Sequence, residues 1–170
     1  MVNPARHALD RGTLENLLKK IPGFHGYLEK EHRRESDFLA RKHMADQLQQ
    51  AKQGLDNYLR GLVDAAQLDA LPPLERVRSR LDGLVSKIRS AERGYSGMFD
   101  FVKVNEGVLD QVYALDMTVL NDVTSLCELF NQLTTRADTP SAVANDLLKR
   151  VDAVEQAFAK RGELLKGLSA

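Results

Sequence analysis

The sequence contains no tryptophan, a single cysteine and no long apolar run, and each absence excludes a class of protein. Cys127 alone cannot form an intrachain disulfide or a cysteine-rich zinc site, which favours a reducing compartment. No stretch approaches the roughly 18 apolar residues that a membrane span requires, and the N-terminal region lacks the apolar core of a signal peptide. We therefore expect a cytoplasmic protein.

An excess of charge of either sign is also missing, because 24 Lys and Arg balance 24 Asp and Glu. A chain without net charge has no global field to attract nucleic acid, and we expect no nucleic-acid partner. The charges are uneven along the chain, however. Residues 1–45 and 72–104 are mildly basic and residues 105–139 are acidic, which suggests that these segments complement each other inside the fold; a basic patch for an outside partner is the alternative.

Leucine, alanine and charged residues dominate the sequence, a composition that favours helices over sheets. The stretch from Phe24 to Leu71 predicts one long amphipathic helix, because apolar residues recur in steps of three and four and no proline interrupts it. The apolar stripe is clean only from Phe38 onward, and charges replace it before that residue. A helix of this length would span roughly 70 Å, so other segments must cover it.

Proline and glycine divide the remaining chain into four further predicted helices with apolar faces, over residues 13–21, 73–93, 105–133 and 140–168. Residues 1–11 are expected to form a flexible tail, and residues 12–170 a single domain. Together these elements predict an all-α fold. It is an elongated antiparallel bundle of four main helices with coiled-coil-like packing, plus a short N-terminal helix, and one helix is unusually long.

The predicted helix over 73–93 is too short to cover the first half of the long helix. The connection after it, Tyr95 to Val104, is unusually apolar, and we expect it to be ordered along that uncovered half. Mobile aromatic and methionine side chains in such a segment suit a recognition surface, although plugging the end of the bundle is the alternative. The predicted partner-binding residues are Tyr95, Met98, Phe99, Phe24, Tyr27, Arg33 and Arg34.

Asp116 falls on the apolar seam of the predicted helix over 105–133. A buried carboxylate must be paired or neutral, so we expect an ion pair or hydrogen bond with Arg33, Arg34, His43 or a backbone group. A ligand-binding or catalytic role, or a kink that turns the carboxylate outward, are the alternatives. Arg161 similarly breaks the apolar seam of the last predicted helix.

Glu29 and His32 have the Glu-x-x-His spacing that di-iron bundles use. A second copy is missing, because none of His7, His25 and His43 has a glutamate three residues before it. We therefore expect a solvated charged face here and no metal or other cofactor.

These observations predict a non-enzymatic interaction or scaffold protein. It would bind a protein partner or a second copy of itself through the long helix and residues 93–104. The alternative is a peripheral membrane protein whose first short helix and basic region up to Lys42 lie on anionic lipid, although that region lacks tryptophan. A second alternative is a metal-binding or enzymatic bundle built around Asp116 and His32.

Overall fold

The computed structural model describes residues 4–27, 29–91 and 106–167, which form helices and no strand. Its helices are α1 (Pro4–Lys20), α2 (Lys30–Asp64), α3 (Leu71–Ser90), α5 (Glu106–Asn131) and α6 (Pro140–Gly167). Short 3-10 turns, η1 (Leu68–Ala70) and η3 (Leu133–Thr135), follow α2 and α5. The predicted all-α fold class is confirmed.

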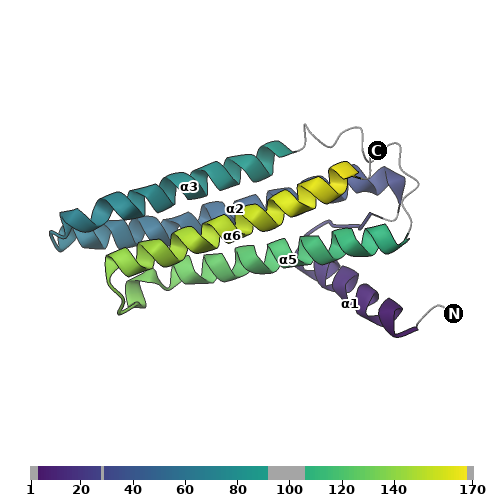
Figure 1. Cartoon of the computed structure of the whole chain (residues 1–170), viewed down its shortest axis with the longest axis horizontal. Helices are drawn as coiled ribbons and strands as arrows, with labels where there is room; N and C mark the ends of the chain where they lie inside the picture. Colours follow the sequence, from purple (N-terminus) through teal and green to yellow (C-terminus); the bar gives the residue numbers. More distant parts are fainter. Residues whose placement is uncertain (1–3, 28, 92–105, 168–170) are drawn as a thin grey trace.

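The four long helices form two antiparallel hairpins, α2 with α3 and α5 with α6 (Figure 1). The hairpins pack so that α2 lies beside α5 and α3 beside α6. α1 packs against α5 at one end, and its N-terminal turns point away from the bundle (Figure 1). No helix of the described chain is both long and apolar enough to cross a lipid bilayer.

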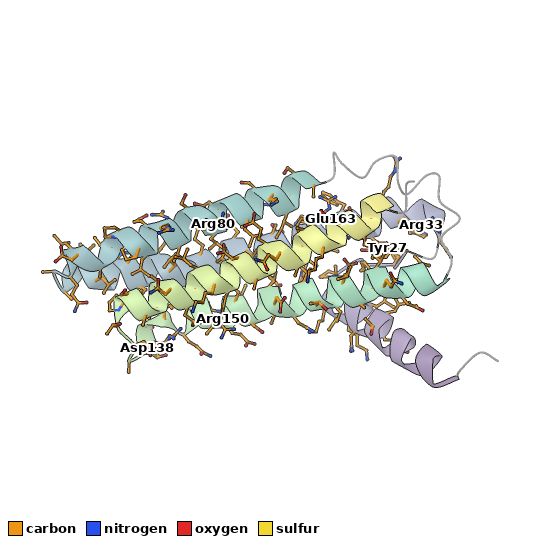
Figure 2. The ribbon with its side chains drawn as sticks, viewed as in Figure 1. Tyr27, Arg33, Arg80, Asp138, Arg150 and Glu163 are labelled. Atoms are coloured by element: carbon orange, nitrogen blue, oxygen red, sulfur yellow. The ribbon has the colours of Figure 1, made fainter. Side chains whose placement is uncertain are left out.

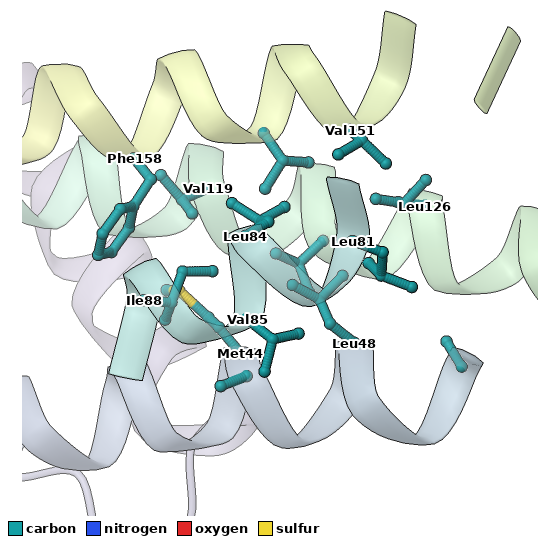
Figure 3. Close-up of a cluster of buried hydrophobic side chains, with 14 of the residues drawn as sticks. Met44, Leu48, Leu81, Leu84, Val85, Ile88, Val119, Leu126, Val151 and Phe158 are labelled. Carbon is teal, nitrogen blue, oxygen red and sulfur yellow. The ribbon is translucent and has the colours of Figure 1, made fainter. Parts of the chain in front are cut away.

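The core is built from apolar stripes at helical spacing on all four long helices. Figure 3 shows where these stripes meet, with side chains of α2, α3, α5 and α6 interdigitating. The labelled members are Met44, Leu48, Leu81, Leu84, Val85, Ile88, Val119, Leu126, Val151 and Phe158. Removing this apolar surface from water is the main force that holds the two hairpins together.

The long helix is confirmed, but it is shorter at both ends than Phe24 to Leu71. α2 begins at Lys30 because Gly23 and Gly26 adopt positive φ angles of 76° and 81°, which turn the chain before the helix. It ends at Asp64, since Ala66 takes a left-handed conformation with φ 56°. The backbone N–H of Gln67 then donates to the carbonyl of Leu62, as in a Schellman cap.

The N-terminal helix is longer than predicted, because residues 4–11 are helical where a flexible tail was expected. Pro4 is the first residue of α1, a position that suits proline because the missing N–H would have no helical partner there. The start of α6 agrees with the prediction: it begins at Pro140, and the Thr139 hydroxyl accepts from the backbone N–H of Ala142 at 3.3 Å. The predicted cover, Tyr95 to Val104, lies outside the described residues.

Gly54 lies where α2 approaches the end of α5 closely. A β-carbon placed at Gly54 would lie 2.3 Å from the carbonyl oxygen of Phe130, which is far inside van der Waals contact. A β-carbon placed at Gly61, on the same helix, would meet nothing within 4 Å. Gly54 is therefore required by packing, whereas Gly61 is not.

We predict that Gly54→Ala lowers the free energy of unfolding by about 1–3 kcal/mol, because backbone atoms must move apart to admit the methyl group. The matched change Gly61→Ala should raise it by up to about 1 kcal/mol through helix propensity. Urea denaturation of both variants measures the difference. Equal effects of the two substitutions would show that α2 and α5 are not in close contact at this point.

Candidate functional site: a buried charged network

The first half of α2 turns three charged residues toward the interior of the bundle. Arg33, Asp37 and Arg41 follow one another at intervals of four residues, which places them on one face, and all three are buried. Phe38 was expected to begin the buried apolar stripe, but its side chain is 45% exposed. That expectation is wrong because α3 ends at Ser90, and Phe38 lies on the part of α2 beyond that end.

Asp116 of α5 and Arg161 of α6 form an ion pair at the centre of this end of the bundle, where they are 0% and 1% exposed. The Nε of Arg161 donates to one carboxylate oxygen of Asp116, and the hydroxyl of Tyr27 donates to the other at 2.5 Å. The partners of Asp116 are thus Arg161 and Tyr27, and the expected pairing with Arg33, Arg34 or His43 is wrong.

Asp37 extends the network from α6 to α3. Its Oδ1 accepts from Nη2 of Arg161 at 2.5 Å, and its Oδ2 accepts from Nε of Arg41 at 2.8 Å. Nη1 of Arg41 in turn donates to the carbonyls of Ile88 and Arg89 at 3.4 and 3.3 Å, in the last turn of α3. Carbonyls in this turn have no helical partner, so Arg41 caps α3 and fixes its end relative to α2.

The strap, defined as residues 21–27, connects α1 to this network. The backbone N–H of Tyr27 donates to the hydroxyl of Tyr113 at 2.7 Å, and its carbonyl accepts from Nε of Arg33 at 2.6 Å. The rings of Tyr27 and Tyr113 stack with centroids 5.3 Å apart, and Phe24 meets Tyr27 edge-on at 5.4 Å. Figure 2 shows Tyr27 and Arg33 at the end of the bundle opposite Asp138.

Burial and charge shift the proton affinities of these groups. Burial raises the pKa of Asp116, and the Arg161 guanidinium opposes that shift. Burial and the neighbouring charge of Asp116 hold the pKa of Tyr27 well above its usual value. Burial alone would lower the pKa of Arg161, but the two carboxylates outweigh it and raise that pKa well above the usual range. The tyrosine therefore stays protonated and donates to Asp116.

Four of the predicted partner-binding residues can be placed in the structure. Phe24, Tyr27 and Arg33 are buried in the chain itself, which corrects their assignment to an exposed binding surface. Phe24 and Tyr27 instead pack against each other, and Tyr27 stacks on Tyr113. Arg34 is exposed on α2. Tyr95, Met98 and Phe99 lie outside the described residues.

The Glu-x-x-His pair lies on the surface at the start of α2. Nε2 of His32 is 3.2 Å from the carboxylate of Glu29, and its ring lies 5.1 Å from that of His25. Within the described residues, no three histidine, cysteine or acidic side chains are arranged to hold a metal ion. Cys127 is partly buried, and burial raises the pKa of its thiol to about 11, which disfavours the nucleophilic thiolate.

The arrangement of the network favours a structural role. Each of the four carboxylate oxygens of Asp37 and Asp116 accepts a hydrogen bond, and the charges of Arg41 and Arg161 balance the two aspartates. Nη1 of Arg161 is the one buried nitrogen of this group without a partner. A catalytic carboxylate must reach its substrate, whereas Asp116 is enclosed by α2, α5, α6 and the strap. The network instead joins these elements in one register.

A sequence signal for this network existed. Asp116 and Arg161 each break an apolar seam, and their helices are consecutive, so the two interruptions could have been paired with each other. Asp37 and Arg41 gave no such signal because the surrounding residues are also charged. No protein-family model, curated protein or solved structure matches this chain at a significant level.

We predict that Asp116→Asn lowers the free energy of unfolding by about 3–5 kcal/mol, because it removes one partner of a buried ion pair. Asp46→Asn is the matched control: Asp46 bonds Lys42 and Arg89 at the surface, and its loss should cost less than about 1 kcal/mol. Urea denaturation at neutral pH compares the two variants. Similar losses would mean that the Asp116 pair is not desolvated.

The raised pKa of Tyr27 predicts a stability change at alkaline pH. An unfolded tyrosine loses its proton near pH 10, while the folded Tyr27 keeps it. Its contribution to stability is therefore complete below pH 10 and is lost as the pH rises, at about 1.4 kcal/mol per pH unit. The stability difference between the natural chain and Tyr27→Phe should shrink by about 1 kcal/mol from pH 10 to pH 11, because the unfolded tyrosine is only half-ionised at pH 10 and the full slope is reached above that pH.

Denaturation curves at several pH values measure this change. Tyr58→Phe is the control, since the half-buried Tyr58 lies at the other end of the bundle, away from the network. The stability difference between the natural chain and Tyr58→Phe is expected to change less with pH. If the difference between the natural chain and Tyr27→Phe stays constant with pH, then the Tyr27 hydroxyl is not held protonated by the network.

Proposed function

We propose that this protein is a non-enzymatic interaction or scaffold bundle that binds a protein partner through the exposed flank of α2 around Phe38. The observation that carries the proposal is the position of Phe38. It is 45% exposed, whereas the other phenylalanines of the described residues, Phe24, Phe130 and Phe158, are buried. An exposed aromatic side chain on a rigid helix is a characteristic centre of a protein interface.

The surroundings of Phe38 support this proposal. Arg34, Glu35 and Lys42 lie one turn away on the same side of α2, and all three are exposed. An apolar aromatic centre with a charged rim matches the composition of protein interfaces, where arginine and aromatic residues are enriched. The buried network beneath holds the backbone of this part of α2 in place, so the surface is preorganised for binding.

Two related expectations stay predictions. The segment over residues 93–104 was expected to share the binding surface, and it lies outside the described residues. The cytoplasmic location expected from the single cysteine and the absence of a signal peptide is likewise untested.

A peripheral membrane protein is the second candidate. Leu18 is exposed on α1 beside Lys19 and Lys20, a combination that suits the surface of anionic lipid. Flotation with anionic vesicles at low and moderate salt tests it. Binding that disappears in Leu18→Ala and leaves Phe38→Ala unaffected would favour the membrane over a protein partner.

Replacing Phe38 by alanine should remove the centre of the interface. We expect Phe38→Ala to reduce capture of the partner from an extract of the native host at least tenfold, because central aromatic residues contribute about 2 kcal/mol or more. Val63→Ala is the matched control, since Val63 is 51% exposed at the other end of α2. Quantitative affinity capture with the tagged full chain measures both, and equal capture by the two variants would contradict the proposal.

A further inference from the structure

The contacts between α2 and α3 define which side of α2 faces α3. The α2 residues that bond α3 are Arg41 and Asp46, near the end of α3, and Lys52 and Asp56 farther along. At about 100° per residue, these four positions fall within one sector of the helix, and Phe38 lies at its centre. Within the described residues, α3 ends at Ser90, before it reaches Phe38, which is 45% exposed.

Further acidic residues lie beyond the end of α3, on the faces of α2 and α6 whose acidic residues bond α3. Arg89 of α3 bonds Asp46 at 3.1 Å, and Glu35 lies eleven residues before Asp46, about three helical turns along the same face. Arg80 of α3 bonds Asp152 of α6 at 2.5 Å, and Glu163 lies eleven residues after Asp152. Glu35 and Glu163 are both exposed, and Figure 2 shows Glu163 on the part of α6 near the end of α3.

Acidic residues thus continue along α2 and along α6 beyond the end of α3. They are of the same kind as the acidic residues that α3 binds. α3 as a whole carries five basic residues and two acidic ones, a net charge of plus three (5 − 2). Asp82 of α3 pairs with Lys52, a residue on the same face of α2. Lys42, beside Phe38, is bonded to Asp46 at 2.7 Å.

We propose that the position beyond the end of α3, between α2 and α6, binds a basic amphipathic helix of a protein partner. Its apolar face covers Phe38, and its basic side chains pair with Glu35 and Glu163. This inference rests on the proposed function and specifies the partner that the Phe38 surface recognises. The mode is helix-in-groove recognition, in which the bound helix continues the packing that α3 makes with α2 and α6.

A suitable probe is a fluorescent peptide with the sequence of residues 74–90, because that helix carries the required apolar and basic spacing. The control peptide has the same sequence with its arginines changed to glutamates. Fluorescence anisotropy with the natural full chain should show saturable binding of the first peptide only. Binding should weaken at least tenfold in Phe38→Ala and in the double variant Glu35→Lys with Glu163→Lys.

Val63→Ala and Glu128→Lys, both at exposed positions elsewhere, should leave the affinity unchanged. Equal binding of the two peptides, or no loss in the double variant, would overturn the basic-helix assignment. If Phe38→Ala lowers the melting temperature of the isolated chain by several degrees and the probe does not bind, the chain itself covers this position and the inference is wrong. If partner capture depends on Phe38 and is insensitive to Glu35 and Glu163, the proposed function stands and this inference fails.

Discussion

The ion pair between Asp116 and Arg161 is the interaction on which one end of this bundle depends. Burying either charge alone costs several kcal/mol, so neither residue can occupy its seam without the other. Each then takes further partners from different elements, Asp116 from the strap and Arg161 from α2. The pair therefore sets where α5 and α6 meet, how α2 is turned, and where the strap is held.

A purely apolar core would hold these helices together without specifying these positions. Apolar side chains tolerate small slips between helices, whereas hydrogen bonds to a carboxylate lose their energy when the donor moves by about 1 Å. The cap that Arg41 places on the last turn of α3 follows the same logic. It couples the end of one hairpin helix to the charged face of the other, and so fixes how far α3 extends along α2.

The fold class and most of the core could be predicted from the sequence, because apolar spacing and proline positions are local signals. The seams of α3, α5 and α6 are examples: Leu74, Val119 and Val151 lie in the core, as their spacing indicates. The start of α2 could not be predicted, since two glycines with positive φ override a helical pattern that continues back to Phe24. The burial of Asp37 and Arg41 was also hidden. Charged residues at helical spacing normally indicate a solvated face, and only the position of Arg161 on a distant helix reverses that reading.

The charged core and the exposed flank of α2 are consequences of one constraint, the short length of α3. Where α3 is present, its apolar stripe packs on α2 and completes the four-helix core. Beyond its end, the elements among the described residues that hold the first turns of α2 are α5, α6 and the strap. Strong, directional contacts from Asp37 and Arg33 supply that anchoring with a smaller packed area. Within the described residues, the face of α2 that α3 would have covered is exposed at Phe38. A helix end that is fixed from within and exposed on one side can accept a partner without paying the cost of becoming ordered.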